Sequence, residues 1–89
     1  MKIYSVLTTA DRMGDIPHSE VKIFATLDKA NEYAKSEIEN IAEDFKLNDC
    51  EYELTEEFLE NDCYNGFIEY DGETYSIVVN ENELHIINV

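Results

Sequence analysis

The segment TLDKANEYAKSEIENIAEDFK, residues 26–46, determines the architecture expected for the rest of the chain. Its apolar residues recur at spacings of three and four, which places them on one stripe of an α-helix. Thr26 occupies an N-cap position, and Asp28 suits the positive end of the helix dipole. We therefore predict a helix over 27–46. The predicted stripe is Ala30, Ala34, Ile38, Ile41 and Phe45, flanked by Tyr33, Glu37 and Ala42.

A helix with a single apolar stripe packs on one surface, and the segments before it are typical of β-strands. Residues 2–9 and 21–25 are rich in β-branched and aromatic side chains. Residues 10–20, which contain Gly14 and Pro17, are expected to form the connecting loop. We predict that these two strands pair in antiparallel fashion.

The C-terminal part of the chain predicts a meander of strands. Asp71-Gly72 between residues 67–70 and 73–79 is typical of a type I′ hairpin turn. In that register Ile68, Tyr70, Tyr75, Ile77 and Val79 share one sheet face. A second turn at Glu81-Asn82 is expected to lead into a last strand at 84–89, with Leu84 and Ile86 continuing that face. On the other face, Val78, His85, Ile87 and Val89 form a patch that another segment or molecule would cover.

Residues 48–66 support two interpretations. Cys50, Tyr52 and Leu54 alternate with glutamates, which favours a short strand. Residues 55–61 (TEEFLEN) begin with a cap-like Thr followed by acids, which favours one or two helical turns. The predicted fold is a single α+β domain spanning residues 1–89, with an antiparallel sheet of about five strands and one long helix on one face (ββα-connector-βββ).

Charge is the most unusual property of the composition. The 89 residues contain 21 acidic and 6 basic side chains, a net charge of −15. Residues 1–36 are balanced, and the entire excess lies in residues 37–89, where Lys46 is the only basic residue. Such a chain is a poor ligand for nucleic acid or anionic membranes, because both are bound through Lys and Arg. It would attract a positively charged partner, although acidity can also serve solubility alone.

Motifs for catalysis or metal binding are not recognisable. Cys50 and Cys63 have acidic or aromatic neighbours, which do not activate a thiol, and their separation does not match zinc-site spacing. An EF-hand alignment starting at Asp49 places Leu54 where glycine is required. Phosphate-binding glycine motifs are missing as well. We therefore expect no enzymatic activity, cofactor or metal, and a soluble, cytoplasmic protein, since neither a secretory signal nor a membrane-spanning run is visible.

Two stretches carry a resemblance. KIYSVLT…VKIFATLDKANEYA, within residues 2–34, resembles the strand–loop–strand–helix start of small phage and mobile-element proteins. CEYELTEEFLENDCYNGFIEYDGE, residues 50–73, resembles compact acidic inhibitors, including anti-CRISPR proteins and other DNA mimics. The resemblance implies a non-enzymatic inhibitor that occupies the nucleic-acid-binding surface of a host protein.

These observations give two functional hypotheses. The first is an acidic inhibitor of a basic, nucleic-acid-binding host protein, with aromatic anchors among carboxylates. The alternative is a small structural or accessory domain that self-associates, for instance as a homodimer, through the sheet face carrying Val78. For the first hypothesis the candidate partner-binding residues are Glu51, Tyr52, Glu53, Glu56, Glu57, Phe58, Glu60, Asp62, Tyr64, Glu69, Asp71 and Glu73.

Overall fold

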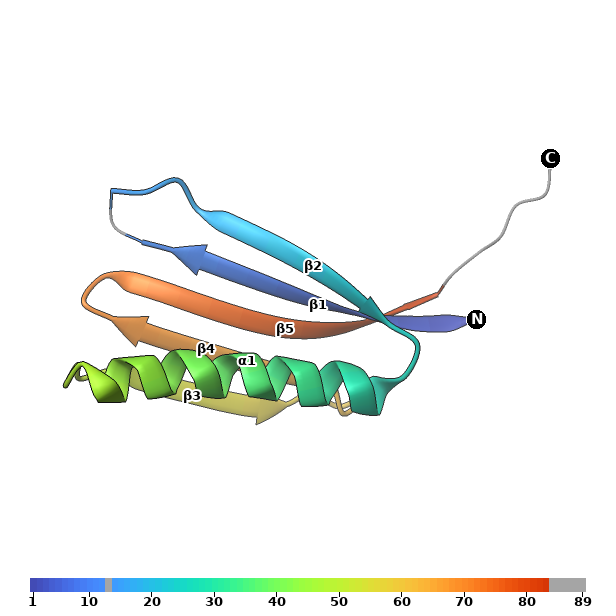
Figure 1. Ribbon diagram of the computed structural model, residues 1–89. Helices are drawn as coiled ribbons and strands as arrows, with labels where there is room; N and C mark the ends of the chain where they lie inside the picture. Colours follow the sequence, from blue (N-terminus) through green and yellow to red (C-terminus); the bar gives the residue numbers. More distant parts are fainter. Residues whose placement is uncertain (13, 84–89) are drawn as a thin grey trace.

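A computed structural model, which describes residues 1–12 and 14–83, has one helix lying across one face of an antiparallel sheet (Figure 1). The strand order is β2-β1-β5-β4-β3, so β2 and β3 form the two edges. This confirms the predicted α+β class with five strands. The elements are β1 (Lys2–Asp11), β2 (His18–Phe24), α1 (Leu27–Leu47), β3 (Glu53–Phe58), β4 (Tyr64–Tyr70) and β5 (Glu73–Glu83).

Helix α1 begins where the sequence predicts. The Thr26 hydroxyl accepts a hydrogen bond from the Lys29 amide at 3.3 Å, which caps the first turn. The residues of α1 that are fully buried against the sheet follow a strict four-residue repeat: Ala30, Ala34, Ile38 and Ala42. Three alanines in this row allow the helix to approach the sheet closely. Ala42, expected beside the stripe, is therefore buried, whereas Ile41 and Phe45 are only half-buried.

The central strands carry the core. Val6 on β1, Ile77 and Val79 on β5, and Ile68 on β4 are completely buried beneath α1. The predicted β4–β5 hairpin is confirmed, because Tyr70 pairs with Glu73 and Ile68 with Tyr75. The turn residues Asp71 and Gly72 have φ of 45° and 85°, both positive as a type I′ turn requires.

The N-terminal hairpin is antiparallel, as predicted, but longer than expected. β1 continues to Asp11 and β2 already starts at His18, with Ala10 opposite His18. The loop predicted over 10–20 is correspondingly shorter. Pairing extends the strands here because Thr8, Thr9 and Ser19 lie in register across the hairpin, and hydroxyl side chains are compatible with a sheet.

The acidic segment after the helix forms the edge strand β3, so the helical interpretation of residues 55–61 is wrong. β3 pairs with β4 over its whole length, from Glu53 opposite Glu69 to Phe58 opposite Tyr64. A helix of one or two turns has a costly nucleus and few hydrogen bonds. Pairing with β4 instead satisfies the backbone hydrogen-bonding groups along one side of β3. It also directs the β3 side chains alternately to the two faces of the sheet.

The turn predicted at Glu81-Asn82 is also wrong. β5 passes straight through these residues to Glu83, which lies opposite Lys2 on β1. The ten residues of β1 provide a template along this whole length, and the Asn82 amide donates to the Ser5 hydroxyl at 3.0 Å. The last strand predicted at 84–89, with Leu84, His85, Ile86, Ile87 and Val89, lies outside the described residues.

Candidate functional site

Carboxylates gather along β3 and the turns at its two ends. β3 supplies three of them and the segment before it one, the β3–β4 turn supplies two, and β4, its turn into β5 and the first residue of β5 supply one each. All except the half-buried Glu73 are exposed. We call this set the acidic edge: Glu51, Glu53, Glu56, Glu57, Glu60, Asp62, Glu69, Asp71 and Glu73.

The acidic edge projects charge to both sides of the sheet. Glu53 lies directly opposite Glu69, so these two residues share the face away from the helix. Glu56 lies opposite Gly66 on the helix-covered face. Like charges on neighbouring strands repel, and such an arrangement weakens a sheet unless a cation approaches from outside.

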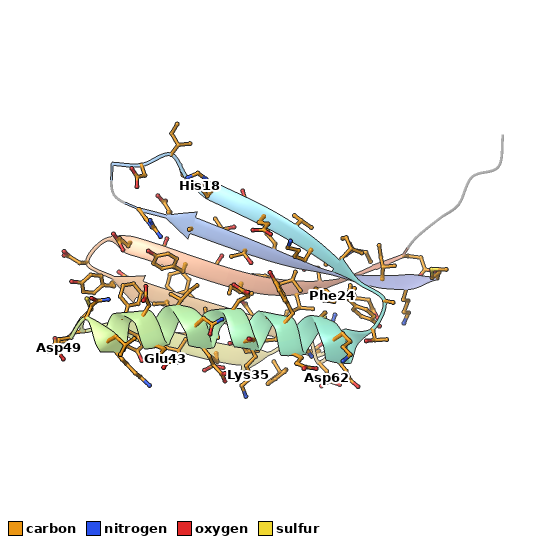
Figure 2. All side chains as sticks on the ribbon, viewed as in Figure 1. His18, Phe24, Lys35, Glu43, Asp49 and Asp62 are labelled. Carbon is orange, nitrogen blue, oxygen red and sulfur yellow. The ribbon has the colours of Figure 1, made fainter. Side chains whose placement is uncertain are left out.

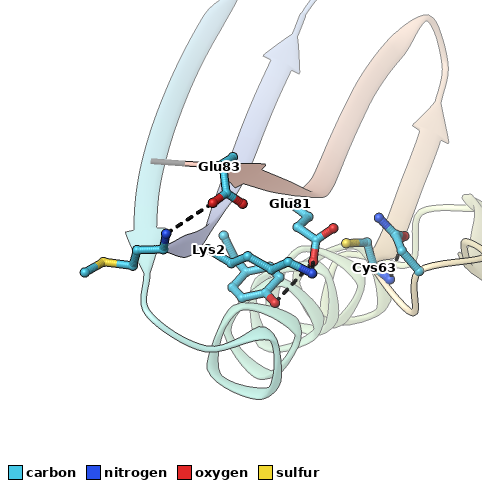
Figure 3. Close-up of polar contacts among 7 residues, drawn as sticks. Lys2, Cys63, Glu81 and Glu83 are labelled. Carbon is cyan, nitrogen blue, oxygen red and sulfur yellow. Dashed lines mark hydrogen bonds and ion pairs between the residues drawn. The ribbon is translucent and has the colours of Figure 1, made fainter. Parts of the chain in front are cut away.

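The described ion pairs use four basic groups, and all of their acidic partners lie outside the acidic edge. Lys2 and the N-terminal amine contact Glu81 and Glu83 at 3.3 and 3.1 Å, at the end of β5 that lies beside Cys63 (Figure 3). Lys22 and Lys29 contact Glu20 and Glu32. Within residues 1–12 and 14–83, no ion pair involves a member of the acidic edge. This surface therefore offers uncompensated negative charge.

A groove of about 430 Å³ runs between the C-terminal half of α1 and the start of β3. Ala42, Leu47, Tyr52 and Leu54 supply its apolar lining. Glu39, Glu43 and Lys46 border it from the helix, and Figure 2 shows Glu43 in the half of α1 that leads to Asp49. Both glutamates are exposed, and the sequence analysis did not single them out. The four-residue spacing of Glu39, Glu43 and Leu47 was the signal that these residues line one face.

Two of the three predicted aromatic anchors are accessible. Phe58 is 61% exposed at the end of β3, and Leu54, which was not among the predicted partner-binding residues, is 38% exposed on the same strand face. Tyr52 is half-buried and stacks on Phe45 with ring centroids 5.8 Å apart. Apolar side chains thus stand among carboxylates along the edge, a combination suited to protein recognition.

Tyr64, predicted as a third anchor, lies instead in the core. It is 1% exposed, and its hydroxyl donates to a Glu56 carboxylate oxygen at 3.0 Å. Burial, reinforced by this carboxylate, raises the pKa of Tyr64 well above the ordinary value of a phenol. Alternation explains the placement, because Tyr64 shares the helix-covered face with Ile68. Its role at the site is to hold Glu56 in position.

Asn31, which the sequence did not single out, fastens the β3–β4 turn to the helix. Its amide nitrogen donates to the Asp62 carbonyl at 2.8 Å, and its amide oxygen accepts from the Tyr64 N–H at 3.0 Å. Asp62 has a φ of 63° in this turn and lies next to the N-terminal half of α1 in Figure 2. Both hydrogen-bonding groups of one side chain therefore orient one end of the acidic edge.

Both cysteines are free thiols at opposite ends of α1. Cys63, beside the Asn31 contact, is buried, and Cys50, whose amide donates to the Phe45 carbonyl, is half-buried. Burial, with a contribution from Glu81, raises the pKa of Cys63, which disfavours the nucleophilic thiolate (Figure 3). In the part of the chain that the structure describes, no three His, Cys, Asp or Glu side chains come together as metal ligands.

No family model matches the chain, and neither a curated protein nor a solved structure matches it. Among residues 1–12 and 14–83, no helix combines the length and apolarity that crossing a membrane requires.

Proposed function

We propose that this protein is a non-enzymatic binding protein whose acidic edge occupies a basic, nucleic-acid-binding site on a host protein, in the manner of an anti-CRISPR inhibitor or another DNA mimic. One observation carries the proposal. The carboxylates of the acidic edge line one side of the sheet without a basic partner among the described residues. A polyanion-binding surface on another protein supplies the missing positive charge.

The geometry supports different roles in binding for the charged and the apolar residues of the site. Carboxylates on β3 and its turns speed the encounter, because a field of one sign steers an oppositely charged partner. Phe58 and Leu54, which are exposed on the helix-facing side of β3, and the adjoining groove supply apolar contacts that slow dissociation. The proposal requires no cofactor or metal, and it places the protein in the cytoplasm with its host target.

The experiment uses the chain immobilised as bait in a nuclease-treated host lysate. The acidic-edge variant changes Glu51, Glu53, Glu57 and Glu60 to Lys; Glu56 is kept because it accepts the Tyr64 hydrogen bond. The control changes four exposed acids outside the acidic edge to Lys: Asp15, Glu20, Glu32 and Glu83. Both variants alter net charge equally.

We expect the parent and the control to capture basic nucleic-acid-binding proteins that added DNA displaces, and the acidic-edge variant to lose them. Association should slow steeply with ionic strength, because the steering field is screened. Equal capture by the two variants, or captured proteins that nucleic acid does not displace, contradicts the proposal.

A further inference from the structure

The sheet face opposite α1 is almost free of charge over its β2, β1 and β5 strands. Alternation and register assign Ser, Thr, Asn and aliphatic residues to this face. Asp11, at one end of β1, is the one charged residue that these three strands, as described, direct to this face. In a chain with a net charge of −15, a nearly neutral surface of this extent is exceptional.

An apolar row crosses the middle of this open face. Leu7 on β1 lies directly opposite Val21 on β2 and directly opposite Val78 on β5, so the row is centred on β1. Val21 and its neighbour Ile23 are 55% and 59% exposed. Leu7 and Val78 are half-buried, and with the exposed Val21 and Ile23 they form an apolar patch that is stabilised when another apolar surface covers it.

The charge distribution indicates which surface covers the patch. A basic partner is attracted to the acidic edge and finds almost no carboxylates on the open face. A second copy is repelled by the acidic edge but meets almost no charge here. We propose that the open face is a dimer interface, in which two copies pack their β2-β1-β5 faces against each other about a two-fold axis at Leu7.

The direction of the axis follows from the acidic edge. An axis perpendicular to the strands would stack the two β3 strands, with Glu53, Glu57 and Glu69 of each copy facing like charges. An axis parallel to the strands places β2 of one copy over β5 of the other. Because β3 is three strands from β1, the two acidic edges then lie on opposite sides, roughly 29 Å apart at a strand spacing of about 4.8 Å.

The footprint predicts a weak dimer. Three strands of about ten residues cover roughly 500 Å² per copy, from strand spacing and rise per residue. The total for the two copies, about 1,000 Å², is below about 1,200 Å², which is the range of transient contacts. Residual repulsion between two chains of net charge −15 weakens association further at low salt. The dimer is therefore expected to be reversible and to tighten as salt is added.

Sedimentation equilibrium of the full chain, from about 1 μM to about 1 mM, tests the proposal. The disrupting variant is Leu7→Lys. The control is Thr55→Lys, on the same face but on β3, outside the footprint and equal in charge change. We expect reversible dimers for the parent and for Thr55→Lys, tighter in about 0.5 M than in about 0.02 M sodium chloride, and at least about tenfold weaker association for Leu7→Lys.

Cross-linking tests the axis and provides a second readout if Leu7→Lys fails to fold. A residue on the two-fold axis faces its own copy across two sheets packed about 10 Å apart, so a short bis-maleimide reagent should cross-link Leu7→Cys into a dimer but should not cross-link Thr55→Cys. A parent chain that stays monomeric throughout, equal effects of the two Lys variants, or equal cross-linking of the two Cys variants overturns the proposal. Dimerisation only after removal of residues 84–89 also overturns it, since the chain's own end would then cover the face.

Discussion

The Tyr64 ring lies directly over the backbone of Gly66, two residues further along β4. A Cβ atom added at Gly66 would stand 2.7 Å from the Tyr64 hydroxyl oxygen and 3.0 Å from a ring carbon. Glycine at this position therefore lets the ring lie flat in the core and lets its hydroxyl reach Glu56 on the edge strand. This contact links the core to the candidate site.

Gly66→Ala should lower the free energy of unfolding by about 1–3 kcal/mol, because the buried ring must move and release Glu56. Tyr64→Phe removes the nearest clashing atom, so the double variant Gly66→Ala/Tyr64→Phe should lose less than the sum of the single losses. Urea denaturation of the four proteins measures this coupling. Strictly additive losses would mean that the ring and Gly66 are not in contact.

Ile38→Ala should lower the free energy of unfolding by about 2–5 kcal/mol, because Ile38 is completely buried between α1 and the sheet. The same change at the half-buried Ile41 should have a smaller effect, although the sequence stripe treats the two residues alike. Lys35→Ala, at an exposed site, should lie within about 0.5 kcal/mol of the parent. A larger loss at Ile41 than at Ile38 would mean that the helix is rotated.

Asn31→Ala should lower the free energy of unfolding by about 1–3 kcal/mol, because it leaves the Tyr64 N–H and the Asp62 carbonyl without their partner. Hydrogen exchange should become faster at Tyr64 and in the β3–β4 turn. Asn40→Ala, an exposed amide on the same helix, is the control. Unchanged hydrogen exchange at Tyr64 would contradict the role of Asn31 in holding the β3–β4 turn against the helix.

Added salt should stabilise the fold at neutral pH. The acidic edge has no basic partner among the described residues, and its charges repel one another. Raising sodium chloride from about 0.02 M to about 0.5 M shortens the screening length to a few ångströms and weakens that repulsion. We expect the urea midpoint to rise. A midpoint that stays constant or falls would show that the carboxylates are compensated.

Stability should fall in mildly alkaline solution. Burial raises the pKa of Cys63 in the folded chain, whereas the unfolded thiol titrates near its ordinary value of about 8.5. Above that pH the unfolded state loses a proton that the folded state keeps, so stability is fully present below about pH 8.5 and decreases above it. Cys63→Ala should reduce the slope between about pH 8.5 and 10. Equal slopes for the parent and Cys63→Ala would contradict the assignment.

Local sequence pattern alone determined the helix and the β4–β5 hairpin. The cap at Thr26, the apolar spacing of α1 and the Asp71-Gly72 turn each depend on residues a few positions apart, and each is found where it was predicted. The uneven charge is also a property of the sequence alone. These features need no knowledge of what lies across the molecule.

Only the tertiary structure decided the secondary structure of residues 48–66, the length of β5 and the surroundings of Tyr64. A strand of six residues with three glutamates has no strong preference of its own, and β4 decides it by pairing. Likewise, pairing with β1 keeps β5 extended through Glu81-Asn82, where the local residues favour a turn. Tyr64 is buried because alternation on β4 turns it toward α1 and Gly66 leaves room for its ring. In each case a contact between distant segments outweighs a weak local preference.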